Sequence, residues 1–184
     1  VESEAVTIQM EPVQAASPVG VTGSSPVGIT LPAEGTDPER SRQWYLDKIS
    51  VPAALERAGT LATVKVAVID TGVDLGHPDL ASKLLPGWNA SNPGQPPQDA
   101  AGHGTSTSGC IAAVAGNGIA IEGVSPNARI IPVKYAETAS SIAECMAWAA
   151  DHADMISMSL SIKTTDPSYG EARETLLRAA QYVM

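Results

Sequence analysis

The chain has 184 residues, of which 43% are hydrophobic and 17% charged, a composition typical of one globular domain of ordinary size. Eleven Lys and Arg against twenty Asp and Glu leave a formal net charge of −9, so the basic surface that a phosphate backbone needs is missing and we expect no nucleic-acid partner. No apolar run approaches the roughly 18 residues that cross a bilayer, so we expect no membrane span.

Residues 1–36 are predicted to form an extended segment. The segment carries four Glu and no Lys or Arg, and four prolines spread along it rule out a helix. Ser-Pro-Val-Gly-Val-Thr at 17–22 is echoed at 25–30, but this repeat is too short to fold alone. The segment is either a linker or an arm that lies across the body of the protein, and the sequence leaves both possibilities open.

From residue 37 onward, helix-like and strand-like blocks alternate. The expected order is a helix at 51–59, a strand at 64–69, a helix at 105–114, a strand at 129–134, a helix at 140–152, a strand at 155–160 and a helix at 169–182. The repeated alternation predicts an α/β fold with a parallel sheet, in which chemistry gathers at the carboxyl ends of strands. Because the chain has no Phe, its core must be built from Ala, Val, Ile, Leu and Met.

Cys110 and Cys145 are the two cysteines of the chain. A chain of this size does not need a disulfide framework, so we expect two free thiols, both buried.

Two short motifs carry the strongest chemical signal. Asp70 ends a β-branched strand and leads into Thr71-Gly72, and His103 stands between two glycines at the start of a small-residue helix. A carboxylate held at a strand end can orient an imidazole and support its positive charge, which is the base half of a nucleophile-activating triad. The plain alternatives are a turn-forming Asp and a structural helix-end His.

These motifs, in this order, resemble the Asp and His signatures of the subtilisin-like serine proteases, the subtilase family. The resemblance covers the chain from Asp37 to about Tyr182. It continues through His77-Pro-Asp-Leu80, Gln98-Asp99, Gly123-Val-Ser-Pro126 and Ile156-Ser-Met-Ser-Leu160. Within the family, the stretches 36–38, 43–46 and 112–129 look most like the kexin and furin branch.

The resemblance implies a three-layer α/β fold, a parallel sheet flanked by helices. Residues 37–184 would form only the amino-terminal part of this catalytic domain, so the fold is expected to be incomplete in this chain. Its function would be that of a secreted or extracytoplasmic serine endopeptidase acting on protein or peptide substrates.

The resemblance also implies a serine nucleophile that these residues do not contain. The family's Gly-Thr-Ser-Met-Ala motif and its oxyanion-hole Asn are absent from the 184 residues. Ser106 follows a Gly-Thr pair, but it lies three residues after His103 on one helix, so its hydroxyl would not face the imidazole across a substrate. We expect the serine and the Asn to come from a carboxyl-terminal half, as a second chain or a further segment, with Tyr182 opening the next strand. The chain alone is expected to be inactive.

Ser159, Leu160 and Ser161 match the edge segment with which family members pair an extended peptide through backbone hydrogen bonds. Ser161 replaces the glycine usual at its position, and Thr71 replaces a second Asp of the furin branch. A strict preference for paired basic residues is therefore not expected.

A structural calcium ion near the amino terminus of the fold is the cofactor that the resemblance implies. Its ligands would be the side chains of Asp37, Asp79 and Asn117 and the backbone oxygens of Ala115, Ile119 and Ile121. Such hard oxygen ligands suit calcium far better than zinc. The alternative is a plain Gly-Asn-Gly turn beside two solvated carboxylates.

Two other functions stay open. A catalytically dead binding or regulatory protein could keep the subtilase fold, although retention of both Asp70 and His103 argues against it. A nucleotide-binding α/β protein is disfavoured because the chain has neither Gly-x-Gly-x-x-Gly nor a P-loop Gly-Lys-Ser/Thr.

Overall fold

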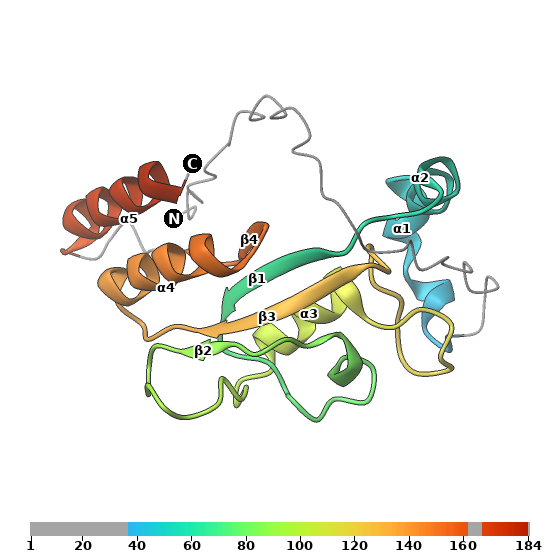
Figure 1. Ribbon diagram of the computed structural model, residues 1–184, viewed down its shortest axis with the longest axis horizontal. Coiled ribbons are helices and arrows are strands. Elements are labelled where there is room, and N and C mark those ends of the chain that lie inside the picture. The colour runs from blue at the N-terminus through green and yellow to red at the C-terminus, as the bar shows by residue number, and fades with distance from the viewer. Residues whose placement is uncertain (1–36, 162–166, 184) are drawn as a thin grey trace, which may run out of the picture.

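The computed structural model describes residues 37–161 and 167–183, and within them a parallel sheet runs through the middle of the fold (Figure 1). The strands lie in the order β2-β3-β1-β4, and each neighbouring pair is parallel. They are β1 (Val64–Asp70), β2 (Trp88–Asn89), β3 (Ala128–Lys134) and β4 (Met155–Met158). The helices are α1 (Trp44–Lys48), α2 (Val51–Ala58), α3 (His103–Ala112), α4 (Ala139–His152) and α5 (Tyr169–Val183), with 3-10 turns at Arg40–Arg42 and Ala81–Lys83. Within this described part, no helix combines the length and the hydropathy of a membrane span.

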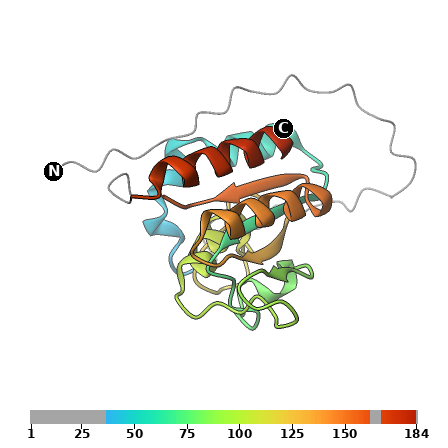
Figure 2. The ribbon, with the colours of Figure 1, turned by 90° about the vertical axis from the view of Figure 1, so that its left-hand side faces the viewer.

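Strand β1 is buried on both faces, which sets the layers of the fold. Ala67 and Ile69 pack with apolar residues of α4 and α5, whereas Val66 and Val68 belong to a second cluster that includes Ala112 of α3. Because successive side chains of a strand point to opposite faces, α4 and α5 cover one face of the sheet and α3 the other. Figure 2 shows α4 and α5 side by side. The predicted α/β class, a parallel sheet flanked by helices, is confirmed.

The sequence of α4 explains where this helix begins and which of its faces packs on the sheet. Thr138 precedes it in an extended conformation, and its side chain accepts a hydrogen bond from the backbone N–H of Ser141. Ile142, Cys145 and Ala149 are buried at helical spacing and join the core on the sheet. The cap marks where this helix begins, and its apolar face packs against the strands.

Several predicted boundaries are corrected. Helix α3 begins at His103 rather than at 105, since Gly102 adopts a left-handed conformation just before it, and it ends at Ala112 rather than at 114. Strand β4 ends at Met158, two residues before the predicted end. Tyr182 does not open a strand, because it lies in α5, whose apolar side packs against the core as far as Val183.

Strand β2 and helix α1 were not predicted. Strand β2 has two residues and exists through its pairing with β3, where Trp88 lies opposite Val133. Helix α1 has five residues, too few for an apolar period to be recognised. Elements this short are defined by tertiary contacts rather than by local sequence.

The expectation of two buried cysteines is half wrong. Both thiols are free, but Cys145 is buried in the core whereas Cys110 is exposed on α3. Only one side of α3 faces the sheet, and Cys110 lies on the other.

Candidate active site

The carboxylate of Asp70 and the imidazole of His103 are paired, as the sequence motifs led us to expect. Nδ1 of His103 lies 2.7 Å from Oδ1 and 3.0 Å from Oδ2 of Asp70. The Asp70 side chain is 1% exposed, whereas the His103 side chain is 57% exposed. A buried carboxylate thus holds one ring nitrogen, and much of the imidazole remains accessible from solvent.

The two residues meet because they end one element and begin another. Asp70 is the last residue of β1 and accepts a hydrogen bond of 2.7 Å from the backbone N–H of Thr71. His103 is the first residue of α3, and Gly104 follows it. A Cβ on Gly104 would lie 2.1 Å from the carbonyl oxygen of Gly72 and 3.0 Å from Cβ of Asp70. Glycine at 104 is therefore what allows the helix start to approach the strand end so closely.

The charge of Asp70 changes the acid–base behaviour of its partner. The hydrogen bond that His103 donates to Asp70, and then the negative charge of that carboxylate, raise the pKa of His103 above 6.5, with a smaller effect of the same sign from Asp99. The paired imidazolium favours the fold below pH 6.5, and this contribution is lost as the pH rises through the raised pKa. Because His103 is largely exposed, its effect on stability is small.

We expect Asp70→Asn to lower the pKa of His103 to 6.5 or below, since the variant loses both the charge and the strongest hydrogen bond to the imidazolium. An NMR titration of the His103 ring protons measures this directly. The ring-proton chemical shifts of His152, the last residue of α4, serve as the internal control and should be alike in both proteins at one fixed pH. An unchanged His103 titration would contradict the pairing.

Ser106 lies where the sequence predicted, on the same helix as His103. Its hydroxyl donates a hydrogen bond of 2.9 Å to the backbone oxygen of Gly102, one turn earlier. This geometry leaves Ser106 turned back on its own helix, and it is not placed to attack a substrate held between α3 and another element.

The predicted substrate segment follows β4 and lies at the same end of the sheet as the Asp70–His103 pair. Ile69 lies opposite Met158 in the register of β1 and β4, so Asp70 and Ser159 continue from adjacent strand ends. Ser159 and Ser161 are exposed, and Leu160 is partly buried. Strand β4 is the outer strand of the described sheet. An extended peptide could therefore reach this segment.

The carboxylates predicted to bind calcium are buried and gather on one loop, so they are not the solvated groups of the alternative reading. Asp37 accepts hydrogen bonds from the backbone N–H groups of Gly116 and Gly118, at 2.7 and 2.8 Å. Asp79 accepts one of 2.8 Å from the side-chain amide of Asn117. In the described residues, no group of three or more His, Cys, Asp or Glu is placed to hold a metal ion, so a cation here would depend on amide and backbone oxygens as well. This all-oxygen set fits calcium.

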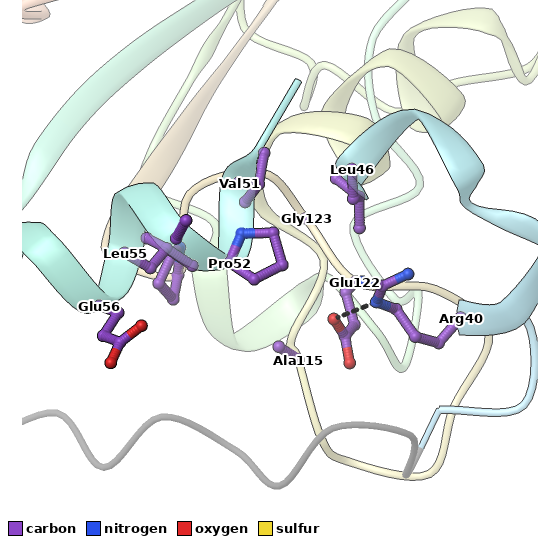
Figure 3. A pocket seen from close by; sticks show the side chains of 11 residues that line it. Arg40, Leu46, Val51, Pro52, Leu55, Glu56, Ala115, Glu122 and Gly123 are labelled. Atoms are coloured by element: carbon purple, nitrogen blue, oxygen red, sulfur yellow. Dashed lines mark ion pairs between the residues drawn. The ribbon is translucent and has the colours of Figure 1, made fainter. Parts of the chain in front are cut away.

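A pocket of about 440 Å³ lies away from the Asp70–His103 pair (Figure 3). It lies between α1, α2 and the loop that follows α3, and its apolar lining includes Leu46, Val51 and Leu55. Arg40 and Glu122 form an ion pair of 3.2 Å at its side. The pocket shares no lining residue with the pair.

Asp99 and the hydroxyls of Thr71 and Thr105 also belong to the surroundings of the pair, although the hydrogen bonds among them were not predicted. Thr71 Oγ1 and Thr105 Oγ1 both donate to the Asp99 carboxylate, at 2.9 and 2.6 Å. The sequence signals for Asp99 were its place four residues before His103, where a helix starts, and the match of Gln98-Asp99 to the family series.

The chain is similar to known proteases over most of its described length. A family model described as "Subtilase family" matches residues 62–183. Thermitase from Thermoactinomyces vulgaris is 39% identical over 126 residues, which are 65% of this chain and 45% of that protein. An alkaline protease from Alkalihalobacillus alcalophilus is 39% identical over 142 residues, 74% of this chain and 36% of that protein.

The chain is also similar in structure to solved proteases. A protease from Pseudoalteromonas arctica has a TM-score of 0.61 and 27% identity, covering 82% of this chain and 57% of that one. Fervidolysin from Fervidobacterium pennivorans, described as a keratinolytic enzyme related to subtilisin, has a TM-score of 0.57 and 26% identity, covering 78% of this chain and 24% of that one. The chain thus spans less than half the length of the two curated relatives above.

Proposed function

The chain belongs to the subtilase family, and we propose from this that it carries the Asp and His of a serine endopeptidase that hydrolyses peptide bonds with an Asp-His-Ser triad. The observation that carries the proposal is the 2.7 Å contact between the buried Asp70 carboxylate and Nδ1 of a solvent-accessible His103.

In this mechanism His103 is the general base. Its Nδ1–H is donated to Asp70, which fixes the tautomer in which Nε2 is free to accept a proton. Nε2 takes the proton of a serine hydroxyl as that oxygen attacks the peptide carbonyl, and then returns it to the leaving amine. Asp70 stabilises the imidazolium that exists between these two steps. Ser159, Leu160 and Ser161 would hold the extended substrate through their backbone groups.

The serine and the oxyanion-hole Asn are proposed to come from a carboxyl-terminal half outside these 184 residues, either a second chain or a further segment. Three observations support this source. The family's serine motif is absent here, and the Ser106 hydroxyl is bonded within α3. Strand β4 is the outer strand of the described sheet, and Met155 on it is 59% exposed. An exposed apolar edge strand is a template for a further strand.

Purified residues 1–184 are expected to hydrolyse neither casein nor a peptide anilide, and Ser106→Ala should leave this result unchanged. The assay is release of the anilide chromophore, with thermitase as the positive control. If the chain were active and Ser106→Ala abolished that activity, Ser106 would be the nucleophile and the proposed division of the triad would be wrong.

The branch of the family and the location of the protein are also part of the proposal. A likeness to the kexin and furin branch rests on the stretches 36–38, 43–46 and 112–129, whereas the two curated relatives reported above are thermitase and an alkaline protease. A secreted or extracytoplasmic location rests on the family resemblance alone. Residues 1–36, as a linker or an arm, lie outside the described residues.

We further propose that calcium is held by Asp37, Asp79 and Asn117 together with backbone oxygens of the loop 115–121. When bound, the ion would supply positive charge to two buried carboxylates. It would thereby tie the chain near residue 37 to the loop after α3, and so stabilise the fold by binding the native state.

Saturating calcium is expected to raise the Tm of the chain by about 5 to 10 °C, because ligand at 100 times Kd contributes about 2.7 kcal/mol. Thermal unfolding with calcium and with EDTA measures the difference. Asp79→Asn should abolish the calcium dependence, whereas Asp151→Asn, an exposed residue of α4, should retain it. A Tm that does not respond to calcium in the unsubstituted chain would contradict the site.

A further inference from the structure

Asp99 has the densest set of hydrogen bonds around the Asp70–His103 pair. Its Oδ1 accepts from the backbone N–H groups of Ala101 and Gly102 and from the hydroxyl of Thr71, each at 2.9 Å. Its Oδ2 accepts from the backbone N–H of Thr105 at 3.0 Å and from the Thr105 hydroxyl at 2.6 Å. Five donors therefore converge on one carboxylate.

These donors come from both elements that build the pair. Gly102 and Thr105 flank His103 at the start of α3, and Thr71 directly follows Asp70 at the end of β1. The hydroxyl of Thr71 donates to Asp99 and accepts a hydrogen bond of 3.0 Å from the backbone N–H of Gly104. Asp99 thus joins the strand end to the helix start at the place where the two catalytic side chains must meet.

The carboxylate of Asp99 is held in its charged form. Partial burial by itself raises the pKa of Asp99, but hydrogen bonds from Thr105, Gly102 and Ala101 outweigh it and hold the pKa well below its ordinary value. A negative charge at the first turn of α3 is also favourable toward the helix dipole. Asp99 therefore stays ionised, and keeps its hydrogen bonds, throughout the pH range in which His103 titrates. The charged groups that act on His103 are Asp70 and Asp99.

We propose that Asp99 is a positioning residue for the Asp70–His103 pair: its carboxylate clamps Thr71 and the first turn of α3 at the separation at which Asp70 and His103 share the Nδ1 proton. The expected effect of Asp99 on catalysis rests on the proposed function. The positioning of Asp70 and His103 by Asp99 does not rest on it. The positioning is a property of the residues described here.

The test is the Nδ1 proton of His103, which in a close pair with a carboxylate gives a strongly downfield NMR resonance. Asp99→Asn keeps the size of the side chain but removes its charge and replaces one acceptor oxygen by an N–H₂ group that faces donors. The two bonds at Oδ2 or the three at Oδ1 should therefore be lost, and those at the remaining oxygen weakened. We expect loss of the downfield resonance and a fall of the His103 pKa in a chain that remains folded by circular dichroism. In the full-length protease, kcat should fall about 100-fold, with little change in KM.

Asp74→Asn is the matched control. The Asp74 carboxylate accepts hydrogen bonds from the backbone N–H of Gly76 and the side-chain amide of Gln98. The variant therefore removes an acidic charge from the same region but no hydrogen bond to Asp70, Asp99 or His103. It should retain the downfield resonance.

A second pair of variants applies if Asp99→Asn does not fold. Thr71→Val removes only the hydroxyl that joins Asp99 to the end of β1 and should weaken the resonance, whereas Thr71→Ser should restore it. The proposal is overturned if Asp99→Asn or Thr71→Val folds with the resonance and the His103 pKa of the unsubstituted chain, or if that chain shows no such resonance. If the resonance responds as expected but the full-length protein has no peptidase activity, the proposed function fails and the positioning role stands.

Discussion

Replacing His103 by Ala in the full-length protease is expected to lower kcat by about four orders of magnitude or more. The reason is that, in the proposed mechanism, the attacking hydroxyl loses the group that takes its proton, while Asp70 keeps a buried charge with no imidazole beside it. KM should change little, because His103 acts on the reacting atoms and not on the remainder of the substrate. Steady-state kinetics on a peptide anilide measure both constants.

His152→Ala is the control for this change. His152 ends α4, and its Nδ1 lies 2.7 Å from the backbone oxygen of Trp148, so its loss removes an imidazole that has no part in the site. Activity should stay within a few-fold of the unsubstituted enzyme. If His103→Ala retained a tenth of the activity, another group would take the proton of the attacking hydroxyl, and the assigned role of His103 would be wrong.

Gly104→Ala is expected to destabilise the chain by about 3 kcal/mol and to separate Asp70 from His103. The added methyl would lie 2.1 Å from the backbone oxygen of Gly72, a contact that cannot exist without moving the start of α3 or the end of β1. Urea unfolding gives the change in free energy of unfolding, and the Nδ1 resonance of His103 reports the separation.

Gly170→Ala is the matched substitution, since Gly170 is the second residue of α5 as Gly104 is the second of α3. A Cβ at Gly170 meets no atom within 4 Å, so the variant should be stabilised by up to about 1 kcal/mol through helix propensity alone. Equal effects of the two substitutions would show that the close approach at Gly104 does not constrain the site.

Strong local patterns account for what could be predicted from the sequence. The β-branched run Val64–Ile69 is a strand because both faces of β1 are buried, and the apolar spacing in α4 follows the face that packs on the sheet. Asp70 and His103 could be predicted as a pair because each stands at a recognisable element end. Their positions relative to each other follow from the parallel topology.

The remaining features depend on contacts between distant parts of the chain. Strand β2 exists through its pairing with Val133 and Lys134, some 45 residues later, and nothing local marks it. The role of Asp99 depends on Thr71, 28 residues earlier, whose hydroxyl reaches it only when β1 and α3 are packed together. Exposure of Cys110 likewise depends on which side of α3 faces the sheet.

The central claim is that the Asp70–His103 pair serves a serine that lies outside residues 1–184. Reaction of the native, active protein with a fluorophosphonate, followed by mass spectrometry of its peptides, locates that serine directly. We predict a single labelled serine in a Gly-Thr-Ser peptide that is not part of the sequence described here, with labelling abolished by His103→Ala. Label on Ser106, or an active protein that takes no label, would contradict the account.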